Sequence, residues 1–208
     1  MTENPENHTE IVKHRRIRAF DGFLSIVEFD FQHRKFDGTM SEILTRQVMN
    51  RGDAVAILPF DAVRDEVVLI RQVLAGNIEA NVPERPLQVI AGMVGFNEFD
   101  TEVAVREAEE EAGVKISELR HAHRFMPSPG GSSERVATFV GRADLSLAGG
   151  IHGLSAEHED IRVEVVSARE AIRLLDSGEI EAGPAVVLLS WFARHHAMLR
   201  YEWLYSRG

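Results

Sequence analysis

The sequence has no cysteine among its 208 residues, and this absence excludes disulfide bonds, thiolate zinc sites and cysteine nucleophiles. A chain without cysteine suits a reducing compartment, so we expect a cytoplasmic location. No apolar run approaches the ~18 residues that a membrane-spanning helix needs. The first ten residues also lack the apolar core of a secretory signal. We therefore expect a soluble protein with no membrane partner.

Positive charge is also scarce, since 23 Lys and Arg residues face 33 Asp and Glu residues, for a net charge of −10. A chain with this much negative charge is not suited to neutralising the phosphates of a nucleic-acid backbone. We therefore expect no nucleic-acid partner. A small anionic ligand can still bind where a metal ion and a few local cations reverse the field. The 44% of hydrophobic residues is typical of a globular protein and excludes disorder of the whole chain.

The first part of the chain, residues 1–49, has the pattern of a small antiparallel sheet. Three strand-like segments lie between Ile11 and Met49, separated by Asp21-Gly22 and Asp37-Gly38. Asp-Gly between alternating segments is a strong hairpin signal, which predicts a three-stranded β meander. Such a sheet is too small to bury a core by itself, so we expect it to pack on the rest of the chain or on a second subunit.

Residues 50–208 mix strand and helix patterns and form the second predicted domain. The first two strands, Ala54–Phe60 and Glu66–Val73, are continuously apolar, as strands covered on both faces are. Three more strands (119–125, 134–141 and 160–166) and three helices (100–112, 167–177 and from about 184 to 201) follow. This order predicts an α/β fold with a mixed sheet between helical layers.

The helix predicted over 100–112 carries Glu107, Glu110 and Glu111 within one sector of its surface. Carboxylates at this spacing repel one another and weaken an isolated helix. They are also the oxygen ligands that hard divalent cations such as Mg²⁺ prefer. A solvated acidic face is the ordinary alternative, and it would be favoured for these glutamates in isolation.

The surrounding residues decide between these alternatives, because they resemble the Nudix box, G-x5-E-x7-R-E-U-x-E-E-x-G-U, where U is apolar. With each residue type at roughly 6% of composition, a chance match is on the order of 10⁻⁹ per starting point. The chain is therefore identified as a member of the Nudix hydrolases, which implies a Nudix α/β/α sandwich and hydrolysis of a nucleoside diphosphate derivative. The seven fixed positions matched are Gly92, Glu98, Arg106, Glu107, Glu110, Glu111 and Gly113.

This resemblance implies a site for Mg²⁺ or Mn²⁺ beside the diphosphate of the substrate. Glu107 and Glu111 would be the main metal ligands, Glu110 a supporting one, and the backbone carbonyl of Ala91 would complete the set. Glu98 and Arg106 would tie the loop before the helix to the helix itself.

Two further stretches, SPGGSSE at 128–134 and GGIHGLSAEHEDI at 149–161, resemble the ADP-ribose diphosphatase branch of the family. That branch cleaves ADP-ribose to AMP and ribose 5-phosphate as a homodimer. It uses a glutamate of the long loop before the last strand as catalytic base. The alignment assigns this role to Glu157, with Glu159 as the second candidate.

The same resemblance implies the substrate-binding residues. Phe23 would stack on the adenine side and Arg46 would contact the nucleotide, both reaching the site of the partner subunit. Ser128 and Gly130 would approach the terminal ribose or the phosphates.

Two departures from the branch bear on the substrate. Leu74 stands where an arginine usually contacts phosphate, and Gln88 stands where a glutamate is usual. These changes leave two alternatives open: hydrolysis of another nucleoside diphosphate sugar, such as a GDP-sugar, and a non-catalytic Nudix-fold module that binds nucleotides.

Overall fold

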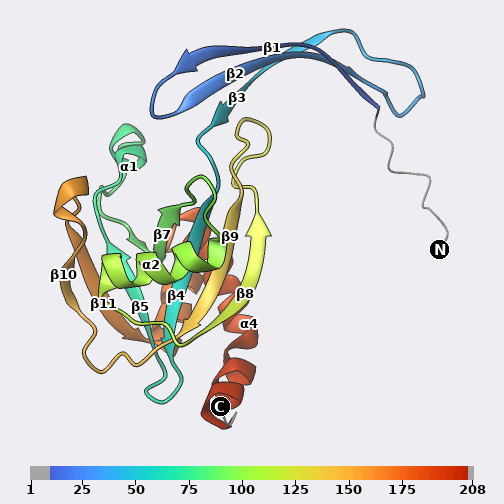
Figure 1. Cartoon of the computed structure of the whole chain (residues 1–208). Helices are drawn as coiled ribbons and strands as arrows, with labels where there is room; N and C mark the ends of the chain where they lie inside the picture. Colours follow the sequence, from blue (N-terminus) through green and yellow to red (C-terminus); the bar gives the residue numbers. More distant parts are fainter. Residues whose placement is uncertain (1–9, 206–208) are drawn as a thin grey trace. The chain divides into compact units, whose positions relative to one another are not determined.

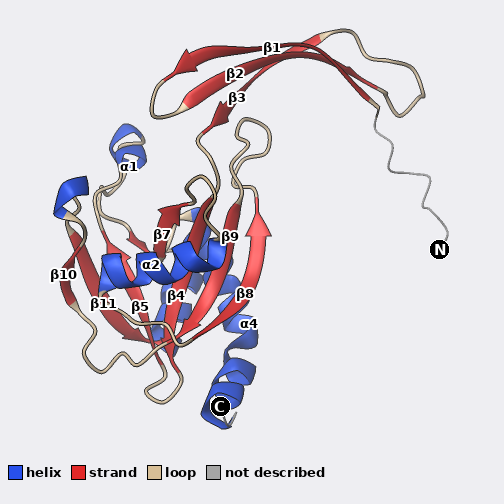
Figure 2. Cartoon of the chain, in the orientation of Figure 1, coloured by secondary structure: helices blue, strands red, loops and turns tan. Residues whose placement is uncertain are grey.

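The computed structural model describes residues 10–205, which divide into two compact units. The first unit comprises the chain up to Arg51 together with residues 128–134, and the second comprises 52–127 and the chain from Arg135 onward. Figure 1 labels the elements of both units, and Figure 2 distinguishes their helices from their strands.

The first unit is a three-stranded antiparallel sheet in the order β1-β2-β3, as the sequence predicted. Its strands are β1 (Ile11–Asp21), β2 (Ser25–His33) and β3 (Leu44–Asn50). Gly38 in the second turn has a φ of +83°, a conformation that glycine adopts without strain. The Asp37 carboxylate closes this turn by accepting a hydrogen bond of 2.8 Å from the backbone N–H of Thr39.

This sheet has almost no core of its own. Every residue of β1 is exposed, and within residues 10–51 only Val27 is buried among the apolar side chains. Backbone hydrogen bonds join the remote segment 128–134 to β3: Met49 N–H donates to Gly131 O at 2.8 Å, and Ser133 N–H donates to Met49 O at 3.0 Å. A domain boundary placed at residue 50 from the sequence leaves this segment out, because its contacts are distant in sequence.

The second unit is an eight-stranded mixed sheet between helices, which confirms the predicted α/β/α architecture (Figure 1). Its main path runs β10-β11-β5-β4-β9-β8, with β4 and β9 parallel and the other neighbours antiparallel. These strands are β4 (Ala54–Asp61), β5 (Glu66–Arg71), β8 (Glu118–Phe125), β9 (Val136–Arg142), β10 (Gly150–His152) and β11 (Ile161–Ser167).

Helix α2 (Asp100–Ala112) covers one face of this sheet, while α3 (Ala168–Asp176) and α4 (Gly183–Tyr205) cover the other. Successive side chains of β5 point to opposite faces of the sheet. Val68 and Ile70 pack with α2, whereas Val67 and Leu69 pack with α3 and α4. Both faces are therefore apolar, which explains the continuous hydrophobic runs of β4 and β5. No helix in residues 10–205 is long and apolar enough to cross a membrane.

A short insertion in the sheet positions the functional region. β4 and β5 pair directly only at Phe60–Val67 and Asp61–Glu66. Beyond this point β6 (Leu87–Gln88) pairs with β5, and β7 (Ile90–Met93) pairs with β4. The sequence did not predict these two strands, which are too short to show a period.

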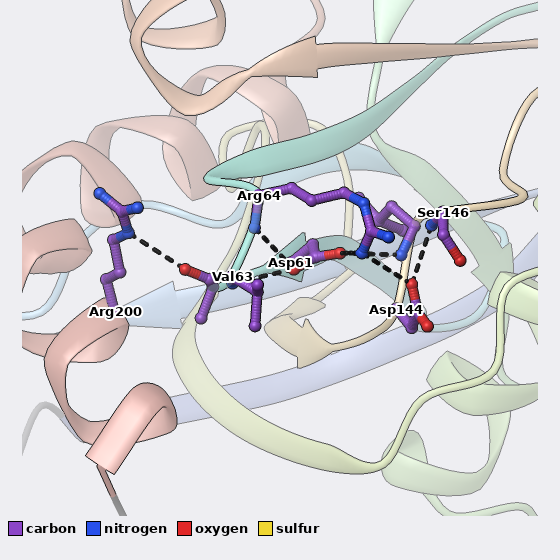
Figure 3. Close-up of polar contacts among 8 residues, drawn as sticks. Asp61, Val63, Arg64, Asp144, Ser146 and Arg200 are labelled. Atoms are coloured by element: carbon purple, nitrogen blue, oxygen red, sulfur yellow. Dashed lines mark hydrogen bonds and ion pairs between the residues drawn. The ribbon is translucent and has the colours of Figure 1, made fainter.

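The opposite end of β4 is closed by a polar network around Asp61 (Figure 3), a residue only 2% exposed. Its carboxylate accepts hydrogen bonds from the backbone N–H groups of Val63, Arg64 and Leu145 and from the Arg64 guanidinium, at 2.8–3.1 Å. Burial alone would raise the pKa of Asp61, but these donors outweigh it and the pKa is lowered. The network therefore holds a charged carboxylate and fixes the β4–β5 turn.

Candidate active site

Helix α2 begins at Asp100, as the sequence indicated. The capping position is Phe99, whose side chain makes no cap hydrogen bond. The helix ends at Ala112, as predicted, and its capping residue Gly113 has a left-handed φ of +64°. A Cβ at Gly113 would approach Cε1 of His152 to 2.8 Å, so this glycine also lets β10 pack against the helix end.

Glu107 and Glu111 of α2 converge on strand β7. Glu111 Oε2 accepts a hydrogen bond of 3.3 Å from the backbone N–H of Ala91. The Glu107 carboxylate lies against Gly92, where a Cβ would overlap it. Gly92 is therefore required for the close approach of Glu107, and the insertion between β4 and β5 brings two carboxylates against the Ala91–Gly92 backbone.

Arg106 organises the other acidic residues of this region. Its guanidinium lies 2.9 Å from Glu110 Oε2, 3.1 Å from Glu107 Oε1 and 3.8 Å from Glu98 Oε2. Glu98 in turn accepts a hydrogen bond of 2.7 Å from the backbone N–H of Gly95. Glu98 and Arg106 thus link the loop between β7 and α2 to the helix, and Arg106 holds the Glu110 carboxylate.

Glu111 has a strongly perturbed acidity. Its side chain is 2% exposed, and burial, followed by the neighbouring Glu107 carboxylate, raises its pKa to about 8. The Ala91 N–H and a hydrogen bond from the Gln72 side chain oppose this rise, whereas the charge of Glu159 adds to it. No role for Gln72 was predicted from the sequence. The only feature that could have pointed to it is its position two residues before Leu74, in the segment RQVL.

The donor chemistry of this site fits a divalent cation. Among the side chains that the structure describes, which exclude that of Glu157, no group of three or more His, Asp or Glu residues forms a ready-made metal site. Glu111, however, is a buried carboxyl close to two further carboxylates. It loses its proton at neutral pH only when a cation balances the negative charge. Glu107, Glu111 and the Ala91 backbone supply oxygen donors of the kind that Mg²⁺ and Mn²⁺ bind.

The raised pKa of Glu111 predicts how stability depends on pH without divalent ions. Between about pH 4.5 and 8 folded Glu111 keeps a proton that the unfolded chain has released. Stability should therefore fall as pH rises through this window, by at most ~1.4 kcal/mol per pH unit. Urea unfolding in chelator at pH 5 and pH 8.5 measures the effect. Glu111→Gln should flatten the profile, and an unchanged profile in this variant would contradict the assignment.

The loop after β10 places Glu159 near the carboxylates of α2. Glu159 Oε2 accepts a hydrogen bond of 3.0 Å from the Leu154 N–H, and the Glu159 N–H donates to Leu154 O at 3.3 Å. These reciprocal bonds close the loop around the single-turn 3₁₀ helix η1 (Ser155–Glu157). The side chain of Glu157 lies outside what the structure describes, so its predicted role as base stays a prediction.

The four predicted substrate-binding residues all lie in the first unit. Arg46 and Gly130 line one groove of about 330 Å³, whose walls also include Phe29 and Phe31. Ser128 lies in the same loop as Gly130, and its carbonyl accepts hydrogen bonds from Gly131 and Ser132 N–H. Phe23, in contrast, is 87% exposed in the β1–β2 turn and does not line this groove.

Sequence reasoning missed the two aromatic residues of this groove. Phe29 and Phe31 alternate along β2, and Phe29 is the cross-strand partner of Arg46. The period of two in SIVEFDFQH was the signal that could have revealed them, since it places both rings on one face of the strand.

The chain belongs to the Nudix family, since the NUDIX domain model matches residues 50–189. It is 41% identical over 198 residues to an ADP-ribose pyrophosphatase of Escherichia coli (strain K12), covering 95% of this chain and 94% of that protein. It is 38% identical over 187 residues to an ADP-ribose pyrophosphatase of Haemophilus influenzae, covering 88% and 86%.

Two other relationships are more distant. A GDP-mannose pyrophosphatase of Escherichia coli O1:K1 is 33% identical over 155 residues, covering 74% of this chain and 80% of that protein. The crystal structure of an ADP compounds hydrolase superposes with a TM-score of 0.70 over 91% of this chain and 96% of that one, at 18% identity. That likeness shows the shared fold.

Proposed function

We propose that this Nudix enzyme hydrolyses the diphosphate of ADP-ribose to AMP and ribose 5-phosphate with the help of Mg²⁺ or Mn²⁺. The observation that carries the proposal is the convergence of Glu107 and the buried Glu111 on the Ala91–Gly92 backbone. The two ADP-ribose pyrophosphatases, which align over most of this chain, supply the substrate class. The absence of cysteine fits the cytoplasmic location that we propose.

The carboxylates would hold the metal, with Glu107, Glu111 and the Ala91 carbonyl as ligands and Glu110 in support. A bound divalent cation neutralises charge on the diphosphate oxygens and lowers the pKa of the attacking water. Arg106 positions Glu107 and Glu110 through its contacts of 3.1 and 2.9 Å. Glu157 would take the proton of the water as general base, with Glu159 as the alternative.

The groove of the first unit suits the adenosine part of the substrate. Its aromatic floor of Phe29 and Phe31 can stack on a base, and Arg46 at its wall can donate to the nucleotide. Gly130, beside Pro129 in the same wall, would allow close approach of a ribose or phosphate, with Ser128 nearby in the loop. Phe23, exposed at the turn, would contribute its ring only from outside this groove.

We further propose that the enzyme is a homodimer. A sheet whose first strand is fully exposed and which buries only Val27 within residues 10–51 needs a partner surface. In the proposed dimer, each meander completes the site of the other subunit.

Complementation tests this dimer directly. Arg46→Ala and Glu107→Gln variants should each be nearly inactive, whereas their mixture after subunit exchange should regain one working site per mixed dimer. Activity near one quarter of wild type is expected for random mixing, since half of the dimers are mixed. A fully active monomer in sedimentation, or no recovery in a mixture shown to contain mixed dimers, would contradict the proposal.

A turnover screen tests the substrate. Purified protein with Mg²⁺ is assayed against ADP-ribose, GDP-mannose, other nucleoside diphosphate sugars and dinucleotides, and the highest kcat/KM is expected for ADP-ribose. Similarity to the GDP-mannose pyrophosphatase, together with Leu74 and Gln88, makes a GDP-sugar the second candidate. Binding of nucleotide without turnover of any substrate would instead indicate a non-catalytic module.

A further inference from the structure

Three arginines of the second unit line the same small cavity. Arg71 ends β5, Arg162 lies on β11, and Arg85 belongs to the segment that leads into β6. Arg71 and Arg162 are direct cross-strand partners. Like charges directly opposite each other destabilise a sheet, so this placement requires compensation.

Strand alternation places this cluster on the far side of the sheet from the metal-binding carboxylates. Val67 and Leu69 pack toward α3 and α4, and Arg71 follows them with a period of two. On β11, Ile161 and Val163 pack toward α2, so Arg162 between them points to the α3 side. The cluster is therefore separate from the proposed catalytic site.

Neighbouring carboxylates compensate these charges only in part. Arg71 Nε donates to Glu164 at 2.8 Å, and Arg85 lies 3.5 Å from Asp160 Oδ2. Among the residues that the structure describes, no carboxylate pairs with Arg162. Around the three guanidinium groups these pairs supply two carboxylates, Glu164 and Asp160, although the chain as a whole carries a net charge of −10.

A small cavity of about 60 Å³ lies between these groups, lined by the three arginines, Ile151 and Asp160. This volume suits one phosphate-sized group and not a base or sugar. A larger cavity of about 260 Å³ shares Arg71 and Arg85 in its wall and is lined further by Leu87, Leu174 and two carboxylate residues, Glu179 and Glu181. It offers room for an organic substituent.

We propose that Arg71, Arg85 and Arg162 form a second anion site, which binds the dianionic phosphate of a phosphate monoester. Guanidinium groups present paired N–H donors that match phosphate oxygens, and three of them converge here. Asp160 competes with the ligand for Arg85, so ligand binding weakens the link between Arg85 and the loop that carries Glu159.

Calorimetric titration of the full-length protein in chelator tests this site without using turnover, so its outcome is independent of the proposed activity. Chelation keeps phosphate from binding through a metal at the α2 carboxylates. Inorganic phosphate, glycerol 3-phosphate and glucose 6-phosphate, none of which is a product of the proposed reaction, are titrated at constant ionic strength. Saturable binding of one equivalent is expected, weakened at least tenfold by Arg162→Gln. Asp160→Asn should strengthen it severalfold by removing the competing carboxylate.

Arg194→Gln is the matched control, because Arg194 is exposed on α4 and lies outside the cluster. It should leave the affinity unchanged. Equal affinity for all three probes would assign the site to free phosphate, and tighter binding of an organic probe would assign it to that monoester. Absence of saturable binding, or equal affinity in the Arg162→Gln and Arg194→Gln proteins, would overturn the proposal.

Discussion

Replacing Glu107 or Glu111 by glutamine should lower kcat at least ~100-fold, equivalent to about 3 kcal/mol of barrier or more, while the fold is retained. Both substitutions preserve the shape of the side chain and remove the charge that would hold the metal. Glu111 is buried and accepts a hydrogen bond from the Ala91 N–H. The amide oxygen of a glutamine can still accept this bond. Steady-state kinetics over a range of Mg²⁺ concentrations, with circular dichroism as a check on folding, measure this effect.

Glu109→Gln is the matched control on the same helix, because Glu109 is exposed and is not one of the proposed ligands. Its kcat should stay near wild type. Glu98→Gln should lose less activity than the two ligand variants, since Glu98 holds the loop through the Gly95 N–H. Turnover like wild type in both the Glu107 and the Glu111 variant would show that the metal assignment is wrong.

The second large effect is expected at the loop between β10 and β11, where Glu157→Gln should cut kcat with little change in substrate binding. A water that attacks phosphorus needs a carboxylate whose lone pairs are not already occupied. Glu159 is the weaker candidate, because its carboxylate already accepts a hydrogen bond of 3.0 Å from the Leu154 N–H. It also lies close enough to Glu111 to raise the pKa of Glu111. A larger loss is therefore expected for Glu157→Gln than for Glu159→Gln, measured as kcat and KM for each variant.

The reverse order would assign the role of base to Glu159. Near-normal rates in both single variants and in the double variant would place the base elsewhere or show that metal-activated water needs none. Gly149, Gly150 and Gly153 before this loop and at its start have positive φ values that other residues rarely adopt.

Local sequence determined the elements that depend on short spacings. The three strands up to Asn50 follow from alternation and from two Asp-Gly turns, and helix α2 follows from its capping glycine and helical period. The seven matched positions of the box also identified the family and placed the glutamates on one helix, because their spacing is a property of consecutive residues.

Tertiary structure alone decided which of these carboxylates face one another. Glu107 and Glu111 converge because β6 and β7 insert between β4 and β5, a pairing of segments too short to show any period. The burial that raises the pKa of Glu111, and the contact of Glu110 with Arg106, depend on this packing. Sequence could not reveal the grouping of Arg46 with Phe29 and Gly130, or that of Arg71 with Arg85 and Arg162. Both groupings arise from strand register and loop packing between residues far apart in the chain. The spacing of neighbouring residues in the sequence does not predict such contacts.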